Sequence, residues 1–210
     1  MTTTATILLV LAGVAALVDW WAVATDRLGV EFIAKPMVII LLIGVALAIE
    51  TDDGVARGIV IAALGASLVG DVVLMTPDAR FEAGLVAFLV AHVLYLAAFA
   101  PHVELVPALV ASLLVVALGL GVVPQVLAGA RKRGGPLVYA VGLYTVAVSA
   151  TAIGAAGTGV LVAAVGGALF LVSDALLGWG SFVGPAPGGR VLVHGTYHVG
   201  QAGLVAWLAA

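Results

Sequence analysis

Residues 56–75 read ARGIVIAALGASLVGDVVLM, twenty residues with only two charges, Arg57 and Asp71. A helix rises about 1.5 Å per residue, so about twenty apolar residues cross the roughly 30 Å hydrocarbon core of a bilayer. The stretch therefore predicts a transmembrane helix. Asp71 stands four positions before its end, where an acidic side chain is costly unless it has partners or a function.

The rest of the chain has the same character. It has 210 residues, of which 64% are hydrophobic and 9% are charged, whereas about a quarter of the residues of a soluble domain are charged. So few charges cannot cover a water-facing surface, so lipid must be the main solvent. The net charge of −3 gives no reason to expect nucleic-acid binding. The lack of cysteine excludes disulfides and thiolate metal sites.

Eight apolar segments are long enough to cross a membrane. They predict an all-α, polytopic membrane helix bundle that forms a single transmembrane domain over residues 1–210. The predicted spans are 4–24, 33–50, 56–75, 81–100, 104–123, 136–154, 159–179 and 190–210. Seven spans is the alternative, because the segments between 104 and 179 contain few polar residues that would separate one span from the next. The first segment has no basic residues before it and is too long for a signal-peptide core, so we expect it to be retained.

Short links with helix-breaking residues separate the predicted spans. They are Asp52-Asp53-Gly54, Pro77-Asp78, Pro101, Arg131 to Gly135, Gly154 to Gly159 and Gly184 to Gly189. Pro36 and Pro136 are expected in the first turns of the second and sixth helices, where the missing N–H costs nothing.

The basic residues predict the orientation, because lysine and arginine accumulate in cytoplasmic loops. One side of the predicted bundle holds seven of them and the other holds only Arg57. The seven are Arg27, Lys35, Arg80, Arg131, Lys132, Arg133 and Arg190. This side should be cytoplasmic, with both termini outside, in a plasma membrane of the bacterial inner-membrane type.

The polar residues inside the spans suggest a repeat. Asp71 is followed twenty-one residues later by His92-Val93-Leu94-Tyr95, and Asp174 is followed twenty residues later by His194-Gly195-Thr196-Tyr197. Both halves therefore contain an aspartate, a turn and His-x-x-Tyr on the next helix. A four-plus-four duplication would relate the halves by an axis along the membrane normal. The alternative is that this short pattern of three residues recurs by chance.

These polar residues should meet in one pocket. Asp71 and Asp174 are expected four and five residues before their helix ends, about 6–8 Å inside the cytoplasmic boundary, and Lys35 opens the second helix on that side. One stripe of the last helix holds His194, Tyr197 and Gln201 at steps of three and four. A stripe of the fourth helix holds Phe81, Gly84, Phe88, His92, Tyr95 and Phe99. The pocket should open toward the cytoplasm and reach the bilayer middle at His92 and Gln201.

In order and spacing, these motifs resemble those of the YhhN-like lysoplasmalogenases. The matching residues are Lys35-Pro36, Gly70-Asp71, Phe81, Gly84-Leu85, Phe88, His92, Tyr95, Gly166 to Phe170, Ser173-Asp174, Thr196-Tyr197 and Gly200-Gln201. The resemblance runs from the second to the eighth helix. It implies eight membrane helices and, since animal members cleave lysoplasmalogens, hydrolysis of a vinyl ether bond. The implied partners are a lysophospholipid with an ethanolamine or choline head group and the bilayer itself.

For that reaction we hypothesise two catalytic carboxyls, Asp71 and Asp174, one protonated and one ionised, with no metal or cofactor. Burial and mutual repulsion in a low-dielectric site favour such a split. The other candidate residues would bind the substrate. Lys35 would bind its phosphate, Phe81 and Phe88 its chain, and His92, Tyr95, Tyr197 and Gln201 would orient water and the glycerol oxygens. His194 is a further substrate-binding candidate.

Other interpretations use the same residues differently. A metal-dependent membrane amide or ester hydrolase would ligate zinc with Asp71, Asp174, His92, His194 and His198, although no HExxH motif is present. A proton-coupled carrier would also bury Asp and His. Asp19, beside Trp20 and Trp21, is expected to be structural at the membrane interface. His102, His198 and the loop Glu50 to Asp53 are expected to be structural or solvated.

Overall fold

The computed structural model describes residues 1–76 and 81–210, and over these residues the chain folds into eight α-helices with no strand. The helices are α1 (Thr3–Ala24), α2 (Leu28–Ala48), α3 (Gly54–Met75), α4 (Phe81–Phe99), α5 (Leu105–Arg133), α6 (Gly135–Gly157), α7 (Leu161–Phe182) and α8 (Gly189–Ala206). The predicted all-α bundle of eight helices is confirmed.

The protein is a multi-pass membrane protein. Among the described residues, the seven helices α1 to α7 are long and apolar enough to cross a membrane. The helix α8 is the exception, because Arg190, His194, His198 and Gln201 make it more polar than the others. Eight of its 18 residues are buried, and they include every strongly polar side chain of α8 except Arg190, so these side chains face protein rather than lipid.

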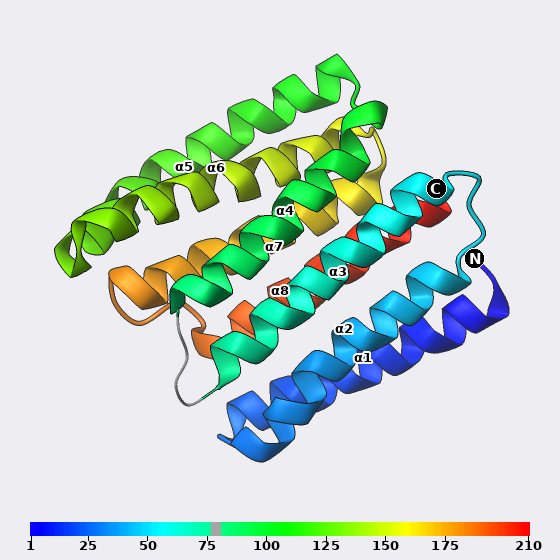
Figure 1. Cartoon of the computed structure of the whole chain (residues 1–210), viewed down its shortest axis with the longest axis horizontal. Helices are drawn as coiled ribbons and strands as arrows, with labels where there is room; N and C mark the ends of the chain where they lie inside the picture. Colours follow the sequence, from blue (N-terminus) through cyan, green and yellow to red (C-terminus); the bar gives the residue numbers. More distant parts are fainter. Residues whose placement is uncertain (77–80) are drawn as a thin grey trace.

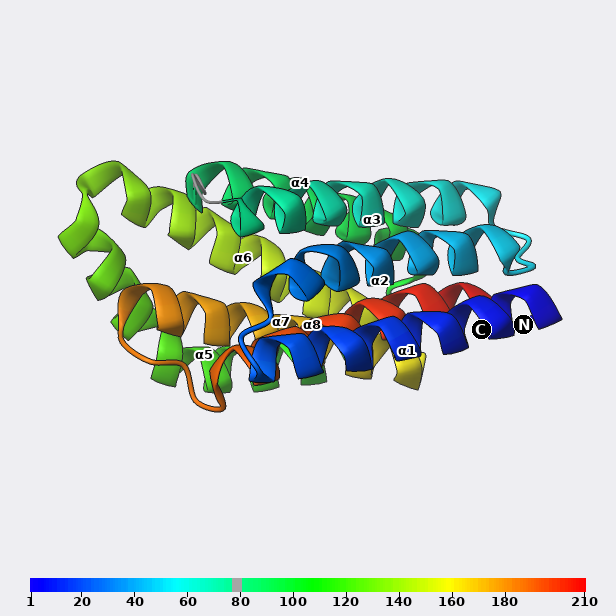
Figure 2. The same ribbon diagram turned by 90° about the horizontal axis from the view of Figure 1, so that it is seen from below.

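Six helices form a closed ring of neighbours in the order α2, α3, α4, α6, α7, α8 and back to α2. Helix α1 packs outside the ring on α2 and α8, and α5 packs outside on α6 and α7. Figures 1 and 2 show the helices running nearly side by side, with both chain termini at one end of the bundle. The shared end agrees with an even number of crossings.

The ring bears on the predicted duplication. Exchanging the halves, so that α2, α3 and α4 take the places of α6, α7 and α8, maps the ring onto itself. Helix α5 departs from this symmetry. As the counterpart of α1, which packs on α2 and α8, it should pack on α6 and α4, but it packs on α6 and α7. The duplication stays a prediction, supported by the order of the ring.

Helix α2 begins earlier than predicted. It starts at Leu28 rather than residue 33, so Pro36 lies inside the helix and the expected first-turn position is wrong. Lys35 is consequently the eighth residue of α2, about 10 Å from its start. The low hydropathy before residue 33 predicts a loop, but Glu31 is buried against other helices, so this polar segment is part of α2. Pro136 does lie in the first turn of α6.

Helices α5 and α7 both run further than predicted. Helix α5 continues through Pro124 to Arg133, and the single residue Gly134, with φ of 151°, turns the chain into α6. Only glycine adopts such a φ without strain. Helix α7 ends at Phe182, so Asp174 lies eight residues before its end, about 12 Å deep rather than 6–8 Å.

The loop Glu50 to Asp53, at the end of the bundle that holds the chain termini, caps the start of α3, as expected for a solvated loop. Asp53 accepts the Ala56 N–H at 2.8 Å and so caps α3. This hydrogen bond, helped by His102 at 3.1 Å, holds the pKa of Asp53 below its ordinary value. The predicted link at Pro77 and Asp78, and Arg80 of the basic side, lie outside the described residues.

Candidate active site

Asp71 on α3 is fully buried and has two partners from other helices. Lys35 Nζ on α2 lies 2.9 Å from Asp71 Oδ1, an ion pair rather than a well-aligned hydrogen bond. Tyr197 on α8 donates its hydroxyl to Asp71 Oδ2 at 2.7 Å. An ammonium and a hydroxyl donor both stabilise the ionised carboxylate.

Asp174 on α7 has a different set of partners. Tyr144 on α6 donates its hydroxyl to Asp174 Oδ2 at 2.8 Å, and His92 Nε2 on α4 lies 3.0 Å from the same oxygen. Thr151 fixes the His92 backbone by donating to its carbonyl at 3.1 Å. Phe170 lies against the imidazole ring, with the ring centroids 4.7 Å apart. In the described part of the chain, no lysine or arginine forms an ion pair with Asp174.

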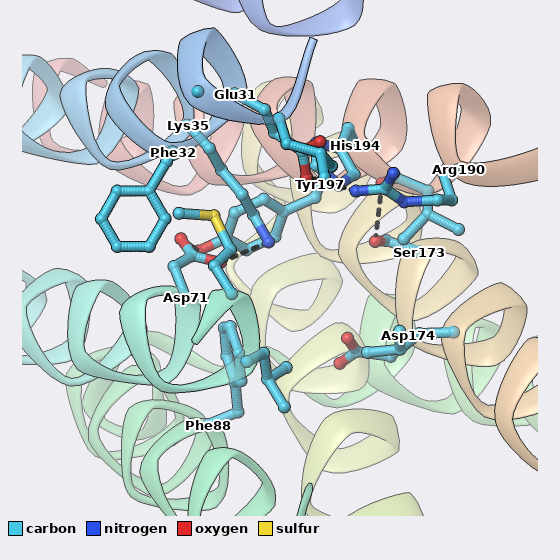
Figure 3. Close-up of a pocket in the computed structure, with 16 residues that line it drawn as sticks. Glu31, Phe32, Lys35, Asp71, Phe88, Ser173, Asp174, Arg190, His194 and Tyr197 are labelled. Atoms are coloured by element: carbon cyan, nitrogen blue, oxygen red, sulfur yellow. Dashed lines mark hydrogen bonds and ion pairs between the residues drawn. The ribbon is translucent and has the colours of Figure 1, made fainter. Parts of the chain in front are cut away.

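Both carboxyls line one cavity of about 550 Å³. Figure 3 shows Asp71 and Asp174 pointing into it from opposite walls, with Lys35 and Tyr197 beside Asp71. Its polar lining consists of Glu31, Lys35, Asp71, Ser173, Asp174, Arg190, His194 and Tyr197. We call this the polar cavity. It lies among the ends of α2, α3, α7 and α8, away from the chain termini.

A second cavity of about 410 Å³ adjoins the first between α4, α5, α6 and α7. We call it the apolar cavity because its lining is mainly Val, Leu and Phe, including Phe81, Val115, Val122 and Val148. Both cavities share four lining residues: Leu74, Phe88, Asp174 and Leu177. Asp174 therefore stands at the junction of a polar and an apolar space.

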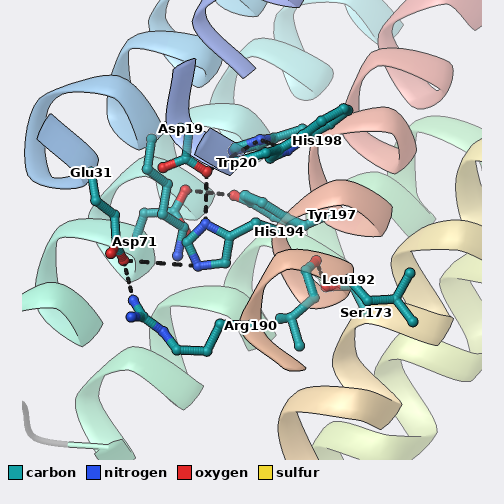
Figure 4. A network of polar contacts seen from close by, with 12 residues as sticks. Asp19, Trp20, Glu31, Asp71, Ser173, Arg190, Leu192, His194, Tyr197 and His198 are labelled. Carbon is teal, nitrogen blue, oxygen red and sulfur yellow. Dashed lines mark hydrogen bonds and ion pairs between the residues drawn. The ribbon is translucent and has the colours of Figure 1, made fainter. Parts of the chain in front are cut away.

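A further group of buried polar side chains borders the polar cavity (Figure 4). His194 Nδ1 lies 2.7 Å from Asp19 Oδ2 on α1, and Trp20 donates its indole N–H to His198 Nδ1 at 3.1 Å. Arg190 forms an ion pair with Glu31 on α2. His194 Nε2 faces Glu31 Oε1 at 4.0 Å.

The structure brings together most of the residues that the sequence singled out. The polar cavity is lined by Lys35, Phe88, His194, Tyr197 and the two aspartates, and the apolar cavity by Phe81 and Phe88. Three other candidates lie behind the cavities, in the described lining of neither: His92, Tyr95 and Gln201. Tyr95 donates its hydroxyl to Gln201 Oε1 at 2.5 Å in the buried core, so this pair supports the walls.

Four residues at or beside the site were missed. Asp19, expected to be a structural residue near the membrane interface, is fully buried and is held by His194 beside the polar cavity. Glu31 and Arg190 stand four residues before Lys35 and His194 on the same helix faces, a spacing that could have indicated them. Tyr144 has no polar counterpart in the first half, so no sequence signal pointed to it.

The suggested zinc ligands are not brought together. Asp174 pairs with His92 and Asp71 with Lys35, whereas His194 and His198 face Asp19. Within residues 1–76 and 81–210, no group of three or more acidic or histidine side chains is placed to hold a metal ion.

Comparison with known proteins places this arrangement in a family. No solved structure matches the chain at a significant level. The model of the YhhN family matches residues 30–208, from the start of α2 to the end of α8. This range contains α3 to α8 and all but the first two residues of α2. It includes both aspartates, the lining of the apolar cavity, and the lining of the polar cavity except Leu28 and Gly29. The chain belongs to the YhhN family.

Proposed function

We propose that this protein is a membrane-embedded hydrolase that cleaves the vinyl ether bond of lysoplasmalogens. The observation that carries the proposal is the position of Asp174 at the junction of the polar and apolar cavities. A lysolipid has one polar head and one long chain, so it would occupy both spaces with its first glycerol carbon at the junction. Cavities of several hundred Å³ suit such a ligand.

The side chains around the junction suit acid catalysis better than acyl transfer. Ester hydrolysis by a serine needs a hydroxyl activated by a nearby base. Ser173, the serine of the polar cavity, donates its hydroxyl to the Val193 carbonyl at 2.9 Å and is buried. Vinyl ether hydrolysis needs a proton donor and a base that activates water, roles that two carboxyls can fill.

In the proposed first step, Asp174 donates a proton to the outer carbon of the vinyl ether. The double bond supplies the electron pair for the new C–H bond, and the positive charge is shared between the inner carbon and the ether oxygen. Asp174, now a carboxylate, stabilises this oxocarbenium ion. Glycosidases use paired carboxyls against a similar cation. Tyr144 and His92 would hold the Asp174 carboxyl in place.

In the second step, water attacks the inner carbon and loses a proton to Asp71, whose carboxylate form Lys35 and Tyr197 stabilise. The product is a hemiacetal. Its hydroxyl then loses a proton to Asp174 while the glycerol oxygen gains one from Asp71, and the C–O bond breaks. A fatty aldehyde and a glycerophospho-alcohol leave, so one water is consumed and both carboxyls return to their starting states.

The basic end of the bundle would face the cytoplasm, with both termini outside. Arg27, Lys132 and Arg190 lie at the same end as the polar cavity. Lysine and arginine mark the cytoplasmic side, so the lipid would enter from the inner leaflet. Protease accessibility of tags placed at either terminus would test this orientation.

Product analysis tests the proposed function. Purified protein is incubated with vinyl ether, alkyl ether and ester lysolipids of one chain length, and the products are identified by mass spectrometry. We expect aldehyde from the vinyl ether lipid alone. Fatty acid from the ester lipid would instead favour an esterase. Transfer of lipid between leaflets of a liposome, without any product, would favour a carrier.

The apolar cavity should limit the length of the chain. Val115 lines it on α5, far from the basic end of that helix. Val115→Trp is expected to lower kcat/KM about tenfold for long-chain substrates and to leave it unchanged for short ones. Each methylene that the filled pocket no longer accepts costs binding free energy in the transition state. Leu113→Trp is the matched control, since Leu113 is 73% exposed on the same helix. An equal loss at every chain length would contradict this placement of the chain.

A further inference from the structure

We infer that Glu31 and Arg190 form a binding site for a zwitterionic phosphoethanolamine head group, Arg190 taking the phosphate and Glu31 the ammonium. The inference rests on the proposed function, because it places the head of the proposed lipid in the polar cavity. It replaces the expected phosphate role of Lys35, whose ammonium is held by Asp71.

Arg190 is free to bind an anion. Its side chain is 53% exposed and lines the polar cavity. A guanidinium has five N–H donors in a planar fork that matches two phosphate oxygens. In the described residues its contact is a single ion pair through Nη2 to Glu31, so the remaining donors can face a ligand.

Glu31 lacks a donor that a ligand could supply. The residue is only 4% exposed and lines the same cavity. Its Oε1 meets Arg190, but its Oε2 is buried and receives no hydrogen bond from any described residue. An unpaired buried carboxylate oxygen is costly. A primary ammonium carries N–H donors and a positive charge, which are what this oxygen lacks.

The charges of the cavity favour a zwitterion over an anion. Lys35 pairs with Asp71 and Arg190 pairs with Glu31, so the four charges cancel in two pairs. Beside the Arg190–Glu31 pair, a phosphate and an ammonium can lie antiparallel, each against its opposite charge. An anionic head without an amine would leave Glu31 facing like charge, which costs affinity in a partly buried site.

The depth of the pair also fits a head group. Glu31 is the fourth residue of α2 and Arg190 the second residue of α8, so both lie at helix ends. Asp174 lies about 12 Å from the end of α7. With its head at Glu31 and Arg190, a lysolipid would extend inward along the polar cavity, which Asp71 also lines, to the junction at Asp174 (Figure 3).

Binding of uncleavable lipids tests the site. Saturated alkyl-ether lysolipids with ethanolamine, choline or glycerol heads are titrated into the purified protein, and Kd is measured calorimetrically. We expect the phosphoethanolamine lipid to bind about tenfold more tightly than the anionic phosphoglycerol lipid. The phosphocholine lipid should fall between them, because it keeps the positive charge but has no N–H donor.

Variants of Glu31 and Arg190 test which part of the head group each residue binds. Glu31→Gln should bring the ethanolamine-to-glycerol ratio of Kd close to one, and Arg190→Gln should weaken all three lipids together. Glu82→Gln is the matched control, because Glu82 is an exposed glutamate in the first turn of α4 that lines neither cavity. If Glu31→Gln does not fold, stepwise N-methylation of the lipid amine tests the same hydrogen bond on the unaltered protein, with the largest fall at the third methyl.

Equal binding of the ethanolamine and glycerol lipids, or a preference that survives in folded Glu31→Gln, would overturn the inference. In the N-methylation series, uniform affinity would do the same. These results are independent of turnover, because the alkyl ethers cannot be cleaved by protonation. Aldehyde release without head-group preference would reject the site alone. Head-group preference without aldehyde release would reject the vinyl ether chemistry alone.

Discussion

Asp174→Asn is expected to lower aldehyde release from a vinyl ether lysolipid by about 10³-fold or more. General acid catalysis by one positioned group contributes about 10²–10⁴-fold, and an asparagine amide cannot protonate carbon. The amide has nearly the shape of the carboxyl and can still accept the Tyr144 hydroxyl. The melting temperature should therefore change little. Rates come from aldehyde measured by mass spectrometry.

Two further variants complete this test, one at the second carboxyl and one as a control. Asp71→Asn should also abolish release, because it removes the carboxylate that Lys35 and Tyr197 hold ready for water. Asp52→Asn is the matched control, since Asp52 is exposed at the other end of the bundle. Substantial turnover in either folded Asp71→Asn or Asp174→Asn would exclude the paired-carboxyl mechanism.

Gly200→Val is expected to prevent assembly of the folded bundle. A Cβ on Gly200 would lie 2.8 Å from the Phe170 backbone nitrogen and 3.0 Å from the Gly166 carbonyl oxygen. Both atoms belong to the backbone of α7 and cannot swing aside. Small residues at membrane helix interfaces allow such close contact. Forcing α7 and α8 apart should cost about 3 kcal/mol or more.

The measurement is the yield of monodisperse protein on size-exclusion chromatography, together with its melting temperature. Gly65→Val is the matched control, because no heavy atom outside its own helix lies within 4 Å of a Cβ added to Gly65 on α3. Both variants carry the same β-branched residue in a helix, so helix propensity cancels. A Gly200→Val protein as stable as Gly65→Val would mean that α7 and α8 do not pack closely in the membrane.

Much of the fold could be predicted from the sequence because the bilayer imposes a simple rule. About twenty apolar residues must be helical, since lipid offers no partner to a free N–H or C=O. That rule identified eight helices. It misplaced the start of α2 and the ends of α5 and α7, because polar residues such as Glu31 can continue a helix where protein or the interface surrounds them.

The sequence also indicated two of the three acids that line the polar cavity. Asp71 and Asp174 were found because a carboxyl within an apolar span is costly without a purpose. Their partners could be only partly foreseen. Tyr197 followed from its stripe on the last helix, whereas Tyr144 lies on α6 without any pattern around it.

Only the tertiary structure decided how these groups are paired and what spaces they line. Lys35 meets Asp71 because α2 packs on α3, and His92 meets Asp174 across the ring of helices. The junction of the polar and apolar cavities depends on α3, α4 and α7 together. Periodicity along one helix reports which face is buried, but not which neighbour covers it, because ridge-and-groove packing between helices sets that choice.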